Sequence, residues 1–94
     1  MKLTNIQQKE IDENLSLFGL NDKDKKVYLT LLKTGPNTIT PLGRALGLPP
    51  TTVQAVLQRL ENKGVVAISK KRSRHIYEAL DPVVFKKILE RNAQ

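Results

Sequence analysis

The residues best suited to chemistry in this chain form a run of cations. Lys70, Lys71, Arg72 and Arg74 place four positive side chains within five residues, with no carboxylate among them. Ammonium and guanidinium groups bind phosphate through charge and hydrogen bonds. The same cations could instead only keep an exposed strand edge in solution. The run therefore predicts a phosphate-binding surface or a solvated loop, and the elements around it favour the first.

The composition excludes most catalytic chemistry. The 94 residues contain no Cys and a single His, so thiolate metal sites, disulfides and cysteine nucleophiles lack their ligands. The sequence has no paired acid and base, glycine-rich phosphate loop or nucleophile motif, and we expect neither enzyme activity nor a cofactor. His75 stands beside Arg74 without partner ligands, which favours an exposed strand residue over a metal-binding or pH-sensing role.

The net charge of +7 is distributed unevenly along the chain. Residues 1–21 carry a net charge of −1, whereas residues 22–94 carry 14 positive and 6 negative side chains, a net charge of +8. This asymmetry favours a binding face over uniform solvation. The length fits one domain, 1–94. The sequence lacks both the apolar segment of a secretory signal and the ~20 apolar residues of a membrane span, so we expect a soluble, cytoplasmic protein.

Apolar residues at helical spacing predict the helices that position the cationic run. Asn21 and Asp24 form a capping box at the start of the second helix, near Asp22. The expected apolar stripes, in chain order, are Ile11, Leu15 and Phe18; Val27, Tyr28, Leu31 and Leu32; Leu42, Ala45 and Leu46; Val53, Val56, Leu57 and Leu60; and Val84, Phe85, Ile88 and Leu89. Core packing is also favoured over base stacking for Tyr77.

A helix-turn-helix is predicted over about residues 40–63. Thr40 is the expected N-cap of its short first helix, with Pro41 at the first helical position, and Pro50 opens its second helix. A β-hairpin follows at about 65–80, and the absence of Asn-Gly or Asp-Gly predicts a mobile loop of about four or five residues at its tip. A last helix is expected at about 82–92. The fold class is mainly α with a small β-hairpin, a winged helix-turn-helix.

Three stretches of the sequence resemble a known family. They are Phe18-Gly19-Leu20-Asn21, Lys26-Val27-Tyr28-Leu29-Thr30-Leu31-Leu32, and Leu57-Gln58-Arg59-Leu60-Glu61-Asn62-Lys63-Gly64-Val65-Val66. Together they resemble the DNA-binding domain of TrmB-family transcription regulators, and MarR-type regulators share much of the pattern. The resemblance covers about residues 15–90 and implies binding to double-stranded DNA. Members of the family carry a C-terminal sugar-binding domain. Here we expect a stand-alone module or an effector domain on another chain, and no small-molecule effector is evident.

The resemblance also implies which residues contact DNA, because in such domains the second helix of the helix-turn-helix enters the major groove. Its face opposite the apolar stripe is uncharged in the first two turns. The expected base contacts are Thr51, Thr52, Gln54, Ala55 and Gln58, and the expected backbone contacts are Arg44, Arg59, Lys70, Lys71, Arg72 and Arg74. The alternative is that these polar residues form the solvated face of an amphipathic helix.

The two ends of the chain carry more apolar residues than one small core needs. We expect a homodimer through Ile6, Leu17, Val84, Phe85, Ile88 and Leu89, the alternative being that both terminal helices pack on their own domain. The predicted function is sequence-specific binding of double-stranded DNA by a nucleoid-associated transcription regulator. The alternative is a winged-helix module for protein–protein interaction.

Overall fold

The computed structural model describes residues 4–92, except for the side chains of Phe85, Lys86, Ile88, Leu89 and Asn92. Its elements are α1 (Asn5–Leu17), α2 (Asp22–Thr34), α3 (Ile39–Leu46), α4 (Pro50–Asn62), β1 (Val66–Lys71), β2 (Arg74–Ala79) and α5 (Pro82–Asn92). This mainly helical chain with one antiparallel hairpin has the predicted fold class. Within the described range, no helix combines the length and apolar character that crossing a membrane requires.

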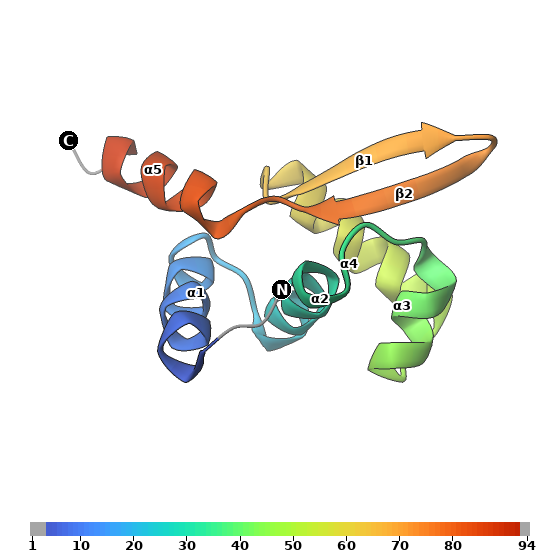
Figure 1. The fold of residues 1–94 in the computed structure, drawn as a ribbon, viewed down its shortest axis with the longest axis horizontal. Coiled ribbons are helices and arrows are strands. Elements are labelled where there is room, and N and C mark those ends of the chain that lie inside the picture. Colours follow the sequence, from blue (N-terminus) through green and yellow to red (C-terminus); the bar gives the residue numbers. More distant parts are fainter. Residues whose placement is uncertain (1–3, 93–94) are drawn as a thin grey trace.

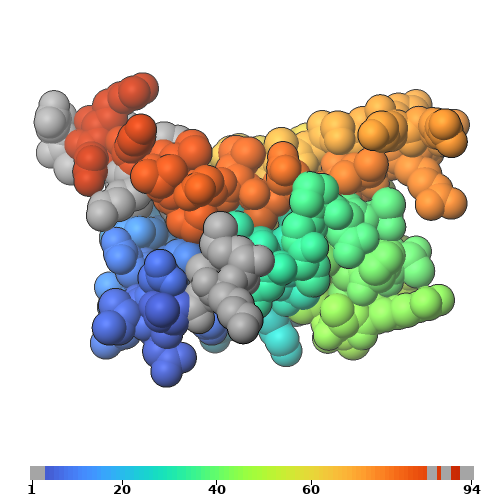
Figure 2. All heavy atoms as spheres, viewed as in Figure 1, coloured from blue at the N-terminus to red at the C-terminus, as the bar shows by residue number. Residues whose placement is uncertain are grey.

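The elements divide the molecule into two ends and a centre (Figure 1). Helices α1 and α5 contact each other at one end, and α3 and the turn of the hairpin lie at the opposite end. Helices α2 and α4 form the centre. In the space-filling view the hairpin runs as a ridge above α3 (Figure 2). Helix α3, the start of α4 and the hairpin tip therefore lie at the same end of the molecule.

The core is built around the contact between α2 and α4. Its buried apolar residues are Ile11, Leu15, Leu20, Val27, Tyr28, Leu31, Leu32, Leu42, Val53, Val56, Leu57, Leu60, Val65, Val66 and Tyr77. The predicted stripes of α2 and α4 are therefore confirmed in full. Apolar side chains at i, i+3, i+4 and i+7 share one helix face, so burying the stripe of α4 leaves the opposite face of that helix exposed, and we call this the bare face of α4.

Two details of α3 differ from the prediction. The helix begins at Ile39 with Thr38 as its N-cap, so Thr40 and Pro41 lie inside its first turn. The reason is a long-range pairing: the backbone of Asn37 exchanges hydrogen bonds of 2.9 and 2.8 Å with the backbone of Tyr77 in β2. This bridge fixes the point at which the chain can turn into the helix. Further along, Ala45 is exposed rather than buried.

A close backbone approach makes the turn of the helix-turn-helix tight. Gly43, which is buried on α3, accepts a 3.0 Å hydrogen bond through its carbonyl from the N–H of Leu48. A Cβ atom at Gly43 would lie 2.9 Å from the Leu48 carbonyl oxygen, closer than such atoms approach in proteins. Gly47 ends α3 with a φ of 66°, in the left-handed region that favours glycine. The angle between α3 and α4 thus depends on residue 43 being a glycine, which has no side chain.

Two buried tyrosines tie the hairpin to the helices. The Tyr28 hydroxyl donates a 2.5 Å hydrogen bond to the carbonyl of Leu80, directly after β2. Burial raises the pKa of Tyr28 above its ordinary value, and the nearby Asp81 carboxylate raises it further. The pKa of Tyr77 is raised by burial first and by Glu61 second. Both tyrosines are core residues, as predicted.

Replacing Gly43 with Ala tests the tight turn. Alanine is the better helix former by about 1 kcal/mol, yet we expect Gly43→Ala to lower the free energy of unfolding by about 1–3 kcal/mol, because the new Cβ collides with backbone. Urea unfolding would measure the change. Ala45→Gly, at an exposed position of the same helix, is the control and should cost only the helix propensity. A Gly43→Ala variant at least as stable as the parent would contradict this account.

Candidate nucleic-acid interface

The bare face of α4 carries the predicted base contacts. Thr51, Gln54, Ala55 and Gln58 are exposed and Thr52 is half-buried. Thr51, Gln54, Ala55 and Gln58 therefore share one accessible face of α4, whereas Thr52 lies on the flank opposite Gln54, beside the buried stripe, at about 100° per residue. The face is uncharged over its first turns, so any discrimination it makes has to come from hydrogen bonds and methyl contacts rather than from charge.

The two glutamines on this face differ in their surroundings. The Gln58 amide donates to the Glu61 carboxylate at 3.2 Å and to the Asn62 side-chain oxygen at 3.4 Å, which turns it toward the C-terminal end of α4. The side chain of Gln54 has no hydrogen-bond partner within the described part of the chain, and its amide is open to a ligand. Gln54 is therefore the better placed of the two to contact a base.

The hairpin turn is shorter than predicted. The strands extend to Lys71 and resume at Arg74, so only Arg72 and Ser73 lie between them, where a loop of four or five residues was expected. Both turn residues have positive φ angles, 51° and 70°. Two-residue turns of this kind match the twist of the strands, but they usually carry Asn-Gly or Asp-Gly. Because Arg-Ser gives no such signal, the sequence could not reveal the turn.

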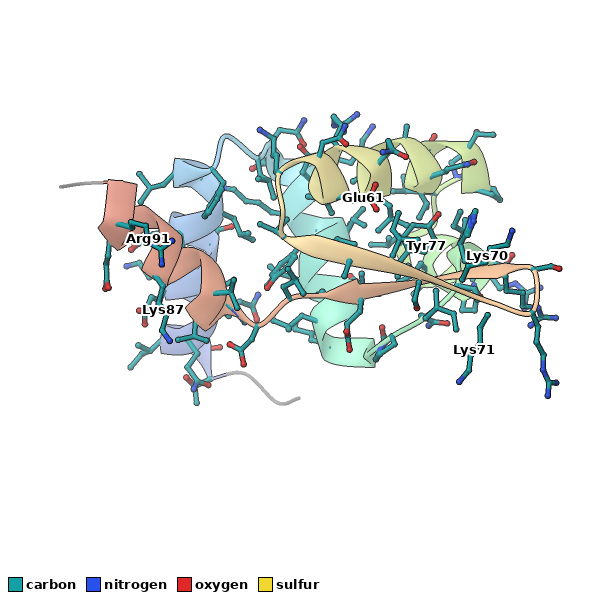
Figure 3. All side chains as sticks on the ribbon, turned by 90° about the horizontal axis from the view of Figure 1, so that it is seen from above. Glu61, Lys70, Lys71, Tyr77, Lys87 and Arg91 are labelled. Atoms are coloured by element: carbon teal, nitrogen blue, oxygen red, sulfur yellow. The ribbon has the colours of Figure 1, made fainter. Side chains whose placement is uncertain are left out.

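We call β1, β2 and their turn the wing. Because the turn is short, the strand register determines the direction in which each cation of the wing points. Lys70 pairs across the hairpin with His75, and Lys71 pairs with Arg74. Successive strand residues point to opposite faces, so Lys70 and His75 share the face of buried Tyr77, whereas Lys71 and Arg74 lie on the other face. Figure 3 shows the Lys70 and Lys71 side chains leaving the hairpin on opposite sides. His75 is exposed on its strand, as predicted.

A hollow of about 550 Å³ separates β2 from the start of α3. Arg74 and His75 line it from the wing, and Thr38, Ile39, Thr40 and Pro41 line it from the helix. Arg44 is exposed on the last turn of α3. The described residues contain no group of three His, Asp or Glu side chains that could hold a metal ion. Arg74 and Arg44 thus both lie at the end of the molecule where α4 begins.

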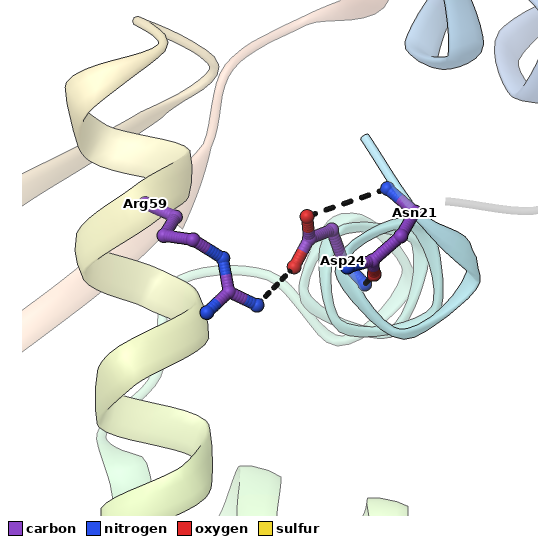
Figure 4. A network of polar contacts seen from close by, with 3 residues as sticks. All are labelled: Asn21, Asp24 and Arg59. Atoms are coloured by element: carbon purple, nitrogen blue, oxygen red, sulfur yellow. Dashed lines mark hydrogen bonds and ion pairs between the residues drawn. The ribbon is translucent and has the colours of Figure 1, made fainter. Parts of the chain in front are cut away.

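Arg59, a predicted phosphate contact, has a different partner in the structure. Its Nη2 lies 2.6 Å from Oδ1 of Asp24, whose side chain is only 4% exposed (Figure 4). From the sequence, Asp24 is predicted only as a capping residue of α2, and its ion pair with Arg59 is not predicted. The two residues are 35 positions apart, and no local pattern links them.

The predicted dimer residues are described only in part. Ile6 is 80% exposed, Leu17 70% and Val84 39%, and Val83, which was not predicted, is 49% exposed. The side chains of Phe85, Ile88 and Leu89 lie outside the described part of the structure. Ile6 and Leu17 are eleven positions apart on α1 and share one face at about 100° per residue.

Comparison with known proteins establishes the class of domain. The fold is similar to that of AbfR from Staphylococcus epidermidis, solved in its reduced form bound to DNA, with a TM-score of 0.64 and 30% identity over 79% of this chain and 55% of that one. It is also similar to Sco5413, a MarR family transcriptional regulator from Streptomyces coelicolor, with a TM-score of 0.62, 21% identity and coverage of 89% and 64%. The chain is a winged-helix domain of the kind found in transcription regulators.

The family follows from the sequence comparisons. A family model described as the sugar-specific transcriptional regulator TrmB matches residues 15–83. The HTH-type sugar sensing transcriptional regulator TrmBL1 of Pyrococcus furiosus is 38% identical over 84 residues, which are 88% of this chain and 24% of that protein. The chain belongs to the TrmB family of transcriptional regulators, as the resemblance predicted. It spans about a quarter of the length of this curated relative.

Replacing Ser73 with Gly tests the conformation of the wing turn. Glycine adopts a positive φ without the Cβ penalty, so we expect Ser73→Gly to raise the free energy of unfolding by about 0.5–1 kcal/mol. Thermal or urea unfolding would measure it. Ser69→Gly, at an exposed position inside β1, should instead lower stability by a similar amount. A destabilised Ser73→Gly variant would rule out the two-residue turn.

Proposed function

We propose that this domain binds double-stranded DNA in a sequence-specific manner and regulates transcription in the cytoplasm, at the nucleoid. The observation that carries the proposal is the position of two different surfaces at one end of the molecule. The uncharged face of α4 begins at the end of the molecule that also carries the basic tip of the wing, which suits a helix in the major groove with the wing on the adjacent backbone or minor groove. The likeness to AbfR, solved bound to DNA, supports this arrangement.

In the proposed complex, the exposed face of α4 contacts bases and the basic side chains contact phosphates. Gln54 and Thr51 contact bases, since an amide can pair with the N6 and N7 atoms of adenine, and the methyl groups of Thr and Ala55 fit a thymine methyl. Thr52, which is half-buried, and Gln58, whose amide contacts Glu61 and Asn62, are further proposed base contacts. The proposed phosphate contacts are Arg44, Lys70, Lys71, Arg72 and Arg74, whose charges attract any DNA sequence equally.

We also propose that the domain acts as a homodimer through its terminal helices. Exposed Ile6 and Leu17 on one face of α1, and Val84 on the neighbouring α5, support it. Phe85, Ile88 and Leu89 belong to the same proposed surface by their spacing. A two-fold dimer would present two copies of α4 to the two halves of a palindromic operator.

A selection from random duplex DNA at defined salt, followed by affinity measurements, tests the DNA-binding proposal. For Lys71→Ala with Arg72→Ala, we expect weaker binding to every sequence and a slope of log affinity against log salt that is smaller by roughly 0.9 unit per lost phosphate contact. Lys87→Ala with Arg91→Ala removes the same charge from exposed positions of α5, at the other end of the molecule (Figure 3), and should leave the slope nearly unchanged. An unchanged slope in the wing variant would show that Lys71 and Arg72 do not contact phosphates. No enriched sequence at any salt would favour a protein-interaction module.

Sedimentation at micromolar concentration tests the dimer. We expect the mass of two chains, and we expect Leu17→Glu to shift the protein toward the monomer because a carboxylate would have to be buried in the interface. Ser16→Glu places the same charge on the adjacent exposed position and is the control. A monomer in the unmodified protein would refute the proposal.

A further inference from the structure

One directional contact holds the flank of α4 against α2 (Figure 4). The Arg59 guanidinium donates to Oδ1 of Asp24 at 2.6 Å, while Oδ2 of the same carboxylate accepts a 3.4 Å hydrogen bond from the Asn21 N–H. The Asn21 side chain accepts in turn from the Asp24 N–H at 2.8 Å. One carboxylate therefore joins the cap of α2 to the helix that carries the proposed base contacts.

The two partners differ in exposure, and this difference makes the pair asymmetric. The Asp24 side chain is 4% exposed and the Arg59 side chain 47%. A buried carboxylate without a counter-charge is costly, so Asp24 depends on Arg59 more than Arg59 depends on Asp24. If Arg59 turned away to bind a phosphate, it would leave an uncompensated negative charge near a polyanion. The present geometry opposes that exchange.

Arg59 also lies where a contact can control the rotation of α4. At about 100° per residue it is about 40° around the helix from Ala55, on the border between the buried stripe and the bare face. Apolar packing of Val56 and Leu60 is non-directional and tolerates small rotations. A short charge-assisted hydrogen bond at the border does not tolerate them.

We propose that Arg59 is a positioning residue rather than a phosphate contact. Together with Asp24 it fixes the rotation of α4 about its own axis, and this holds Thr51 and Gln54 toward the DNA. The inference rests on the proposed DNA binding by α4 and adds the element that determines its specificity. Because the pair is already neutral, it contributes little to the attraction of arbitrary DNA.

The test uses a double variant that carries both Asp24→Asn and Arg59→Gln and therefore keeps the net charge at +7. This double variant leaves no unpaired buried charge, and Asn at position 24 can still accept from the Asn21 N–H. We expect the ratio of specific to non-specific affinity to fall by roughly tenfold, the worth of about one base contact, while the salt slope stays unchanged. A salt slope smaller by about one unit would identify Arg59 as a phosphate contact and overturn the proposal. An unchanged affinity ratio would overturn it as well.

Two further variants separate positioning from other effects. Arg59→Gln alone should have a lower midpoint of thermal unfolding than the double variant, because it strands the Asp24 carboxylate, and the reverse order would contradict the pairing. Asp12→Asn with Lys25→Gln removes the ion pair of 3.4 Å between α1 and α2 and should leave the affinity ratio unchanged. If the unmodified protein binds no duplex, the proposed function fails. If it binds and the double variant keeps its affinity ratio, only this inference fails.

Discussion

The structure depends on the burial of one stripe of α4 against α2. Val53, Val56, Leu57 and Leu60 are all buried, so α4 is anchored along its whole length by non-directional apolar contact. The same periodicity leaves its other face bare. A helix that is buried on one side and accessible on the other can be held rigidly and still enter a groove, which a freely exposed helix of this length could not do because short helices are marginal in water.

Apolar burial alone does not set angles between elements, and a few directional contacts do so here. The close approach of Gly43 to Leu48 sets the angle between α3 and α4. The Asn37–Tyr77 bridge places β2 beside the start of α3, and the Tyr28 hydroxyl holds the chain at Leu80. The last two contacts join the hairpin to the start of α3 and to α2, and both of these helices pack against α4. The wing and α4 are therefore fixed relative to each other through the core.

The features that could be predicted from the sequence are those that depend on residues close together in the chain. The apolar stripes of α2 and α4, the Asn21–Asp24 capping box and the proline that opens α4 are all local patterns, and the structure has each of them. The misplaced start of α3 arose from a backbone pairing with Tyr77, forty positions away. The short wing turn was missed because Arg72 and Ser73 are not residues that favour positive φ. The partner of Arg59 was missed because ion pairs between distant helices leave no periodic trace.

The distribution of cations on the wing bears on how it would contact DNA. Lys70 lies on one face of the hairpin, Lys71 and Arg74 on the other, and Arg72 at the tip. A two-stranded ribbon lying flat along one phosphate strand could bring only one face into contact. A ribbon whose edge enters the minor groove has a phosphate strand on each side. Both of its faces then lie next to negative charge, and its tip reaches the base edges at the floor of the groove. In the proposed complex, the two-sided charge of this wing therefore favours insertion into the groove over contact with a single backbone.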